Sequence, residues 1–461
     1  MVLPIAMASS FMSSQEVFDW LDQFINHDPN QTFPRFRPER MRIIAGLTGN
    51  PERCAPSFHV AGSKGKGSVT EMLASILEAM GLRTARYVSP HVSDFRERIT
   101  LGRKFLGENI YIEAGNELEE LVKILGDQTK AEYRLFNGSG PDDAPPTYFE
   151  LLTIYYFICA RLVRCDAMAV ETGLGGEQDP TNIVDSAASL ITVIELEHTE
   201  YLGNTLVEVA GTKAGIIKPG RPLILAEQRA EVLEVFRRAA AEKNSPLLYF
   251  PDIAEIRDLS IRRDGTNFTL AFRKPGYFSE PLGLRVGIPG AVQALNAGLA
   301  VIALKTVYPS LDAETIRRGL GGFALPGRFE NLRPEEPAVI IDGAHTEKSV
   351  ELCANTFTAL YGNGGILLFG CAVGKNAEAM AAILKPRFSR IVITDPGSYR
   401  TSNPEAVYET FARSAGQAEL LFIPETAKAI DYALEEGLKT GLPVLGTGSF
   451  YLAGDIRERF Y

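Results

Sequence analysis

Apolar, β-branched runs alternate with amphipathic stretches along this chain. SFHVAG precedes the helical pattern VTEMLASILEAM, and three further runs end in polar or glycine-rich turns: AMAVET, SLITVIEL and RPLILA. Short apolar runs of this kind are typical of buried strands. The alternation predicts an α/β fold in which helices cover a mostly parallel sheet.

A second series of strand-to-loop units begins after about residue 326. Its five members are AVIIDGAH, GILLFGCA, RIVITDP, AELLFIPE and LPVLGTGS. At 461 residues the chain is also longer than one typical domain. We therefore predict two α/β domains, over 1–320 and 326–461, with the hinge at four residues: Gly321, Gly322, Pro326 and Gly327.

Between the two series lies a segment with a different period. LSIRRDGTNFTLAFRKPG alternates around Asp264 and Gly265, which predicts an antiparallel hairpin. The helical pattern LNAGLAVIALKTVY follows it, before the glycines of the predicted hinge.

Composition and charge narrow the class of protein. Hydrophobic residues make up 45% of the chain and charged residues 23%, as in globular proteins. The formal charge of -10 argues against a nucleic-acid binder, which needs a basic surface. No run approaches the roughly 20 uninterrupted apolar residues of a membrane-spanning helix. We expect no nucleic-acid partner and no membrane association.

The cysteines and the first residues bear on the compartment. The five cysteines are odd in number and form no CxxC pair, so neither a disulfide framework nor a zinc site is indicated. The opening MVLPIAMASSFMSS lacks a basic segment and is a poor signal peptide. We read it as a frayed terminus and expect a cytoplasmic protein.

The sharpest local signal is HVAGSKGKGSVTEMLASILEAMG, an apolar strand that runs through glycines into a helix. Glycines let backbone N–H groups converge on phosphates, a lysine adds charge, and the helix N-terminus adds its partial positive charge. The spacing departs from GxxxxGK[ST], because Gly67 separates Lys66 from Ser68. The alternative is a tight strand-to-helix connection without a ligand. We assign phosphate binding to Gly62, Gly65, Lys66, Gly67 and Ser68.

GKGS followed by YVSPHVSDFRERI resembles the Mur ligase superfamily, and within it the folylpolyglutamate synthase and dihydrofolate synthase branch. Further blocks recur in the family's order: TYFE, ETGLGGEQDPTNIV, LEHTEYLG, TKAGIIK, PGRFE, IDGAH and GTGSFYLAGDIR. The resemblance covers most of the chain. It implies a Mur-ligase-like P-loop N-terminal domain that binds ATP and a smaller, Rossmann-like C-terminal domain, the glutamate ligase domain.

The resemblance also implies a metal site. Ser89 and Glu171 would hold one Mg²⁺, and Glu171 and His198 a second, while Lys213 would be carbamylated and so supply an anionic oxygen. Lys66, Lys213 and His198 are then the catalytic residues. The alternatives are a turn cap for Glu171, a structural role for His198 and a solvated surface position for Lys213. His91 could be a structural neighbour of Ser89.

For the base and ribose of the nucleotide, the family's residues fall on Asn296, Arg328, Asp342 and His345. These lie near the hinge or beyond it, whereas the phosphate loop lies in the first domain. Binding of ATP would therefore couple to domain closure, which excludes water from the reacting groups. Each of the four could instead have an ordinary turn or capping role.

What the resemblance implies for chemistry is attack of a substrate carboxylate on the γ-phosphorus of MgATP. The acyl phosphate would then react with the amino group of L-glutamate. The pterin or folate acid would contact two segments of the chain: Thr147, Tyr148, Phe149 and Glu150, and then Glu177, Gln178 and Asp179.

The chain departs from the family at several positions. Glu177 stands where an arginine is usual, which reverses a charge beside the predicted acid site. Ser63 and Lys64 replace Thr and Asn, and Glu197 replaces Asp.

Three functions therefore stay open: a ligase adding glutamate to dihydropteroate, folates or both, a related amide ligase with another acid, and a nucleotide-binding protein without ligase activity. We expect a monomer whose partners are small molecules.

Overall fold

The computed structural model describes residues 10–25, 38–126, 146–397 and 401–461. Most of the predicted frayed terminus, residues 1–9, lies outside these ranges. Within them, no helix is both long and apolar enough to cross a membrane.

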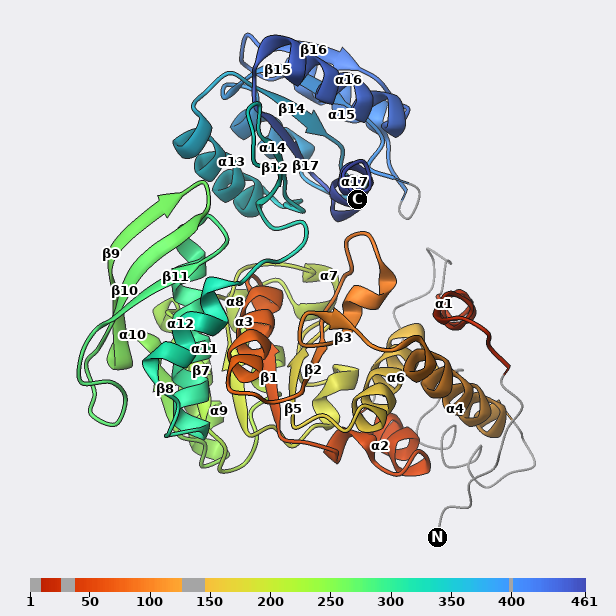
Figure 1. Cartoon of the computed structure of the whole chain (residues 1–461), viewed down its shortest axis with the longest axis vertical. Coiled ribbons are helices and arrows are strands. Elements are labelled where there is room, and N and C mark those ends of the chain that lie inside the picture. The colour runs from red at the N-terminus through yellow and green to blue at the C-terminus, as the bar shows by residue number, and fades with distance from the viewer. Residues whose placement is uncertain (1–9, 26–37, 127–145, 398–400) are drawn as a thin grey trace.

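The phosphate-loop strand lies in the middle of an eight-stranded sheet (Figure 1). In spatial order its strands are β4 (Lys104–Phe105), β3 (Ile99–Leu101), β2 (Thr84–Tyr87), β5 (Ala167–Glu171), β1 (Ser57–Ala61), β6 (Ala188–Ile191), β7 (Leu223–Leu225) and β8 (Leu247–Tyr249). The six strands from β2 to β8 in this order are parallel, and β3 and β4 add on antiparallel. The predicted mostly parallel sheet is confirmed.

Helices cover both faces of this sheet because both faces are apolar. In β5, Ala167 and Ala169 belong to the core under α3 (Lys66–Ala79), α11 (Ala291–Val307) and α12 (Ala313–Gly321). The alternate residues Met168 and Val170 belong to the core under α4 (Glu108–Gly126) and α6 (Tyr148–Leu162). Successive strand side chains point to opposite faces, so one strand serves two cores.

Shorter helices complete this part of the chain. They are α1 (Ser14–Asp22), α2 (Pro38–Leu47), α7 (Thr199–Leu202), α8 (Leu206–Ala214), α9 (Ala230–Glu242) and α10 (Phe250–Ile253). Three 3₁₀ turns lie at Pro51–Arg53, Phe95–Arg98 and Pro180–Ile183.

A separate antiparallel sheet contains the predicted hairpin. Its strands are β9 (Ala254–Arg262), β10 (Gly265–Phe272) and β11 (Leu282–Val286), with β10 in the middle. Arg262 pairs with Gly265, so the turn falls where the sequence predicts it. Arg285 donates to Asp264 in that turn at 2.7 Å and thereby ties β11 to it.

The second series of apolar runs forms a six-stranded sheet. Its order is β12 (Glu330–Arg333), β13 (Val339–Ile341), β17 (Val444–Thr447), β14 (Gly365–Phe369), β15 (Phe388–Ile393) and β16 (Glu419–Phe422). All five predicted strands are present and parallel, and β12 is antiparallel to β13. One face packs on α13 (Glu347–Tyr361), α14 (Ala377–Leu384) and α15 (Pro404–Arg413), and the other on α16 (Thr426–Thr440) and α17 (Phe450–Arg457). This is the predicted Rossmann-like arrangement.

The chain passes from one sheet region to the other in the segment 322–329. We call the described residues up to Gly321 the N-terminal unit and residues 330–461 the C-terminal unit. Figure 1 shows the C-terminal unit as a distinct body above the other, joined through this segment. Of the predicted hinge residues, Gly322, Pro326 and Gly327 lie here and Gly321 ends α12, and hinge motion remains a prediction.

Candidate active site

Predicted site residues of the N-terminal unit gather at one edge of the large sheet. The phosphate loop follows β1, Ser89 follows β2, Glu171 ends β5, and His198 lies beyond β6. These strands are parallel neighbours, so their carboxyl ends share an edge. In open α/β sheets this edge is where ligands bind.

Two glycines of the phosphate loop, Gly62 and Gly65, have no room for a side chain. Gly62 has φ 144°, and a Cβ atom there would overlap the Thr192 hydroxyl. Gly65 has φ 88°, and its Cβ would lie 2.7 Å from Asn296 Oδ1. Asn296, predicted to bind the nucleotide, therefore touches the loop itself. Its Nδ2 donates to Gln293 Oε1 at 3.1 Å, within α11.

Two lysines converge on one carbonyl oxygen of this loop. Lys66 Nζ, at the start of α3, and Lys213 Nζ, on α8, each donate to the Gly62 carbonyl at 3.0 Å. Lys213 is only 1% exposed, so a solvated surface role is excluded. It also pairs with Glu197 at 3.0 Å.

Burial sets the protonation chemistry of Lys213. Desolvation, followed by repulsion from Lys66, lowers the pKa of Lys213 to about 8, against the attraction of Glu197. An amine with this pKa is partly neutral near physiological pH. Neutral amine is the form that adds carbon dioxide, so the site suits the predicted carbamylation.

Glu171 is a buried carboxylate that faces cations. Its Oε2 accepts a hydrogen bond from the Ser89 N–H at 3.1 Å, and a Cβ on Gly67 would lie 3.4 Å from the same oxygen. Burial raises the pKa of Glu171, while Lys66, the Ser89 N–H and Arg328 act to lower it. Such a carboxylate at the mouth of a phosphate loop fits a hard cation such as Mg²⁺.

The loop after β6 is tied to the phosphate loop. Ser63 Oγ donates to the Glu195 carbonyl at 2.9 Å and accepts from the Glu195 N–H at 3.0 Å. His198 follows with φ 47° and starts α7. It is exposed at this edge, and partial desolvation lowers its pKa while Glu197 opposes that shift. An exposed neutral imidazole beside Lys66 is available as a ligand.

Within the described residues, no three His, Cys, Asp or Glu side chains form a metal cluster. The predicted ligand set is of another kind, because it mixes a hydroxyl, a carboxylate, an imidazole and a modified lysine. Of its members, the structure places Ser89 against Glu171 and Lys213 beside the loop.

His91 has a structural partner. Arg98 Nε donates to its Nδ1 at 2.8 Å, and burial together with Arg98 lowers the pKa of His91 to about 4. The ring is therefore a neutral acceptor that holds the loop after Ser89.

The predicted residues of the C-terminal unit lie at the carboxyl end of β13. Asp342 accepts from the Phe329 N–H at 2.9 Å and from the Ala344 N–H at 2.8 Å. His345 Nδ1 donates to the Gly343 carbonyl at 2.8 Å, and burial lowers its pKa to about 4. The backbone contacts of Asp342 organise the loop, and both side chains remain candidates for the nucleotide.

Arg328 faces this loop from the connecting segment. Its guanidinium lies 4.4 Å from the centre of the Phe450 ring. Desolvation lowers the pKa of Arg328, and Asp342 and Glu171 act to raise it. Arg328 therefore interacts with one carboxylate in each unit.

Positive charge from both units meets across the phosphate loop. Arg328 acts on Lys64, and Lys375, in the loop after β14, acts on both His198 and His345. Desolvation likewise lowers the pKa of Lys64. Like charges brought together from opposite sides favour an anion between them.

Sequence reasoning did not assign Lys64, Lys375 or Glu197 to the site. Lys375 had a usable signal, because it follows a predicted strand in the glycine-containing loop GCAVGKN. Lys64 and Glu197 were noticed only as departures from the family. Their roles depend on pairings across the fold that no local pattern encodes.

The TYFE segment begins α6. Thr147 and Glu150 form a capping box: the Thr147 hydroxyl accepts from the Glu150 N–H at 3.2 Å, and Glu150 accepts from the Thr147 N–H at 2.8 Å. Phe149 lies against Gly173, two residues after Glu171, where a Cβ would come within 2.8 Å of the ring. Tyr148 and Phe149 meet edge to face, with centroids 5.9 Å apart. Phe149 therefore lies beside the turn that follows Glu171.

The segment after GLGG divides into an inner and an outer part. Asp179 is buried, and its carboxylate accepts from the Leu174 N–H at 2.8 Å and the Thr181 N–H at 3.0 Å. Glu177 and Gln178 are exposed. Glu177 acts electrostatically on Lys243.

Comparisons with known proteins agree with this geometry. Residues 327–450 match the family described as "Mur ligase, glutamate ligase domain". The dihydrofolate synthase/folylpolyglutamate synthase of Bacillus subtilis is 31% identical over 426 residues, covering 91% of this chain and 94% of the relative. The chain belongs to the folylpolyglutamate synthase and dihydrofolate synthase family.

Solved structures of this family share the fold over nearly the whole chain. Folylpolyglutamate synthase of Mycobacterium tuberculosis, complexed with ADP and AMPPCP, matches with a TM-score of 0.84 and 26% identity, covering 97% of this chain and 98% of that chain. The E. coli FolC in complex with DHPP and ADP matches with a TM-score of 0.80 and 26% identity, covering 98% of this chain and 99% of that chain. The family resemblance predicted from the motifs is confirmed.

We expect Lys66→Ala and the longer, uncharged Lys66→Met to lower ADP release by about a hundredfold or more, because both remove charge from a transferring phosphoryl group. Folding should change little, since the Lys66 ammonium makes one hydrogen bond, to Gly62. Steady-state ADP release and thermal melting test this. Near-normal turnover with an unchanged melting curve would make Lys66 an ordinary loop lysine.

We expect Lys213 to be carbamylated and activity to depend on bicarbonate. With a pKa of about 8, roughly a quarter of the amine is neutral at about pH 7.5, so activity in limiting bicarbonate should rise with pH through this region. Short carboxylic acids should partly restore Lys213→Ala. Native mass spectra without an adduct, together with full activity of Lys213→Ala, would contradict this.

Proposed function

We propose that this chain is an ATP-dependent ligase that joins L-glutamate to dihydropteroate, to folates or to both. The observation that carries the proposal is the cluster around the Gly62 carbonyl, where Lys66 and Lys213 meet. Beside it lies the buried carboxylate of Glu171, which Lys66 attracts. Family membership supports glutamate ligation as the use of this cluster.

In the first half-reaction, a carboxylate oxygen of the acid attacks the γ-phosphorus of ATP, and the bond to the bridging oxygen of ADP breaks. The phosphate-loop N–H groups and Lys66 hold the transferring group and offset its charge. Glu171, Ser89, His198 and carbamylated Lys213 would hold Mg²⁺, which supplies further charge neutralisation. The product is an acyl phosphate, with ADP as the leaving group.

In the second half-reaction, the neutral amine of L-glutamate attacks the acyl carbon. The amide bond forms as the bond to phosphate breaks, and the amine loses its proton. The acyl phosphate is prone to hydrolysis, so water has to be excluded. Arg328, Asp342 and His345 on the far side of the site would bind the nucleotide and draw the units together.

A second candidate is a related ligase that uses another acid. It is favoured by Glu177, where the family usually has an arginine. Glu177 is exposed and interacts electrostatically with Lys243, which weakens the case for a different acid.

We further propose a cytoplasmic monomer. All five cysteines are free thiols, and Cys54 Sγ and Cys165 Sγ lie 3.9 Å apart without a bond, which suits a reducing compartment.

ADP release with a panel of acids and amines tests the function. Turnover should require both dihydropteroate or a folate and L-glutamate, and the product should gain the mass of one glutamyl residue. Turnover with a different acid alone would favour the second candidate. ADP release independent of any acid would overturn both.

Glu177→Arg should lower the KM for dihydropteroate or monoglutamyl folate by about tenfold, if residue 177 lies beside the bound acid. A charge reversal at several ångströms is worth roughly 1 kcal/mol or more, and 1.4 kcal/mol is one decade. The kcat should move less, because the contact is remote from the transferring group.

Two further variants serve as controls for this experiment. Glu177→Gln separates loss of repulsion from gain of attraction. Glu231→Arg makes the same charge change at an exposed position on α9. An unchanged or raised KM for Glu177→Arg would place residue 177 outside the acid site.

A further inference from the structure

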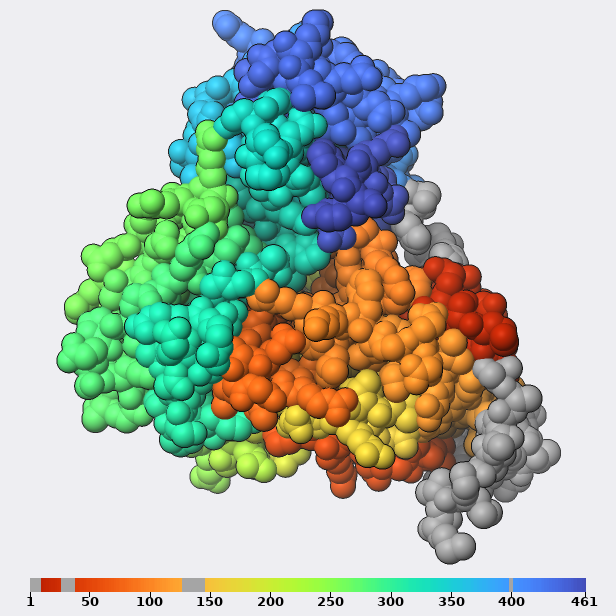
Figure 2. Space-filling view, in the orientation of Figure 1, coloured from red at the N-terminus to blue at the C-terminus, as the bar shows by residue number. Residues whose placement is uncertain are grey.

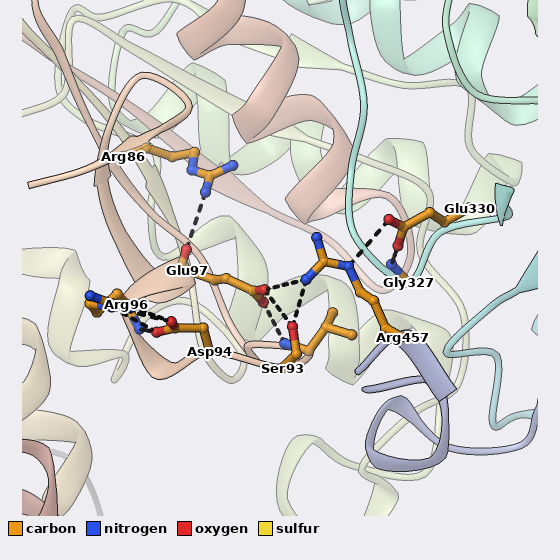
Figure 3. A network of polar contacts seen from close by, with 9 residues as sticks. Arg86, Ser93, Asp94, Arg96, Glu97, Gly327, Glu330 and Arg457 are labelled. Atoms are coloured by element: carbon orange, nitrogen blue, oxygen red, sulfur yellow. Dashed lines mark hydrogen bonds and ion pairs between the residues drawn. The ribbon is translucent and has the colours of Figure 1, made fainter. Parts of the chain in front are cut away.

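Arg457, the last residue of α17, contacts both units of the protein (Figure 3). Its Nη1 lies 2.6 Å from Ser93 Oγ and 3.4 Å from Glu97 Oε1, both in the N-terminal unit. Its Nε donates to Glu330 Oε1 at 3.2 Å, at the start of β12. The side chain is 21% exposed, so water screens these contacts only partly.

The partner of Arg457 in the N-terminal unit belongs to the loop that carries Ser89. Glu97 Oε2 accepts from the Val92 N–H at 2.7 Å, and its Oε1 accepts from Ser93 Oγ at 3.1 Å. The Glu97 carboxylate thus closes the part of the loop from Val92 to Glu97, which continues the chain from Ser89. A shift of Arg457 would act on the loop that holds a predicted metal ligand.

Glu97 is also connected, through Arg86, to α3, the helix that begins at the phosphate loop. Arg86 Nη2 donates to the Glu97 carbonyl at 3.1 Å, and Arg86 Nε donates to Thr100 Oγ1 at 3.0 Å. The other end of the Arg86 guanidinium pairs with Glu71, which is buried on α3. The polar contacts therefore run without a gap from α3 to α17.

On the C-terminal side, the contacts reach Arg328. Glu330 Oε2 accepts from the Gly327 N–H at 2.8 Å, next to Arg328 in the chain. Gly327 also lies against Val92, where a Cβ would come within 3.1 Å of the side chain. Gly454 on α17 is so close to the Val92 carbonyl that a Cβ would overlap it. Figure 2 shows this contact as the dark blue end of the chain against the orange segment.

We propose that Arg457 is a positioning residue that holds the C-terminal unit in the orientation in which Arg328 faces Glu171. Arg457 can do this because it pairs with Glu97 in the N-terminal unit and with Glu330 in the C-terminal unit. This proposal rests on the proposed function only in that ATP binds between the units.

The test is binding of the ATP analogue AMPPCP with Mg²⁺, measured by calorimetry, so that it does not depend on which acid is the substrate. Arg457→Ala should raise the Kd about tenfold, and Arg457→Lys should recover part of the loss. Arg459→Ala is the matched control, because Arg459 lies two residues further on and pairs with Asp431 inside the C-terminal unit. It should leave the Kd unchanged.

A second variant approaches the same contact from the other unit and guards against a folding defect. Glu97→Gln should raise the Kd by a similar factor, and Arg457→Ala combined with Glu97→Gln should weaken binding by less than the sum of the two single losses, since the variants share one interaction. Small-angle scattering with AMPPCP should show less compaction in each variant than in the wild type.

A Kd within twofold of the wild type for Arg457→Ala, or additive losses in the double variant, would overturn the proposal. Loss of acid-dependent turnover in the wild type, with these binding differences intact, would instead count against the proposed function alone.

Discussion

The site depends on how this protein holds several cations within reach of one another. Lys66 and Lys213 share the Gly62 carbonyl, Arg328 acts on this site from the connecting segment, and Lys375 acts on it from the C-terminal unit. Glu171 and Glu197 compensate part of this charge, and burial makes every uncompensated part costly. Even when Lys213 carries the predicted carbamate, the cations Lys66, Arg328 and Lys375 favour an anion with several oxygens, such as a nucleotide triphosphate.

The surrounding packing keeps these charges in place. Thr192 packs against Gly62 and Asn296 against Gly65, which restricts the backbone conformation of the phosphate loop. Ser63 ties that loop to the loop of Glu197 and His198. Asp179, whose pKa is raised by burial, uses its carboxylate to fix the turn after Glu171. The predicted site residues are thus held in position by packing and hydrogen bonds from residues that do not themselves have to contact a ligand.

Two sheets contribute to one site, and ion pairs and hydrogen bonds are among the contacts between the units. Arg457 bridges Glu97 and Glu330, Arg263 pairs with Glu336, and the connecting segment 322–329 joins the units covalently. Polar contacts can be broken and remade in water at low cost, whereas an apolar interface of the same area would resist separation. Such polar contacts are compatible with the hinge motion predicted for the segment 322–329.

The sequence alone predicted much of the fold and of the phosphate-binding site. The apolar runs predicted both sheets, because strand period and turn residues are local properties, and GSKGKGS predicted a phosphate loop because glycine and lysine chemistry is local too. The family motifs predicted the fold and the ligase class. The three-dimensional structure alone showed that Lys213 is buried against Gly62, that Glu197 is its partner, that Glu177 is exposed and acts on Lys243, and that Arg457 bridges the units. These are contacts between residues far apart in the chain, and burial and electrostatic pairing arise only when folding brings such residues together.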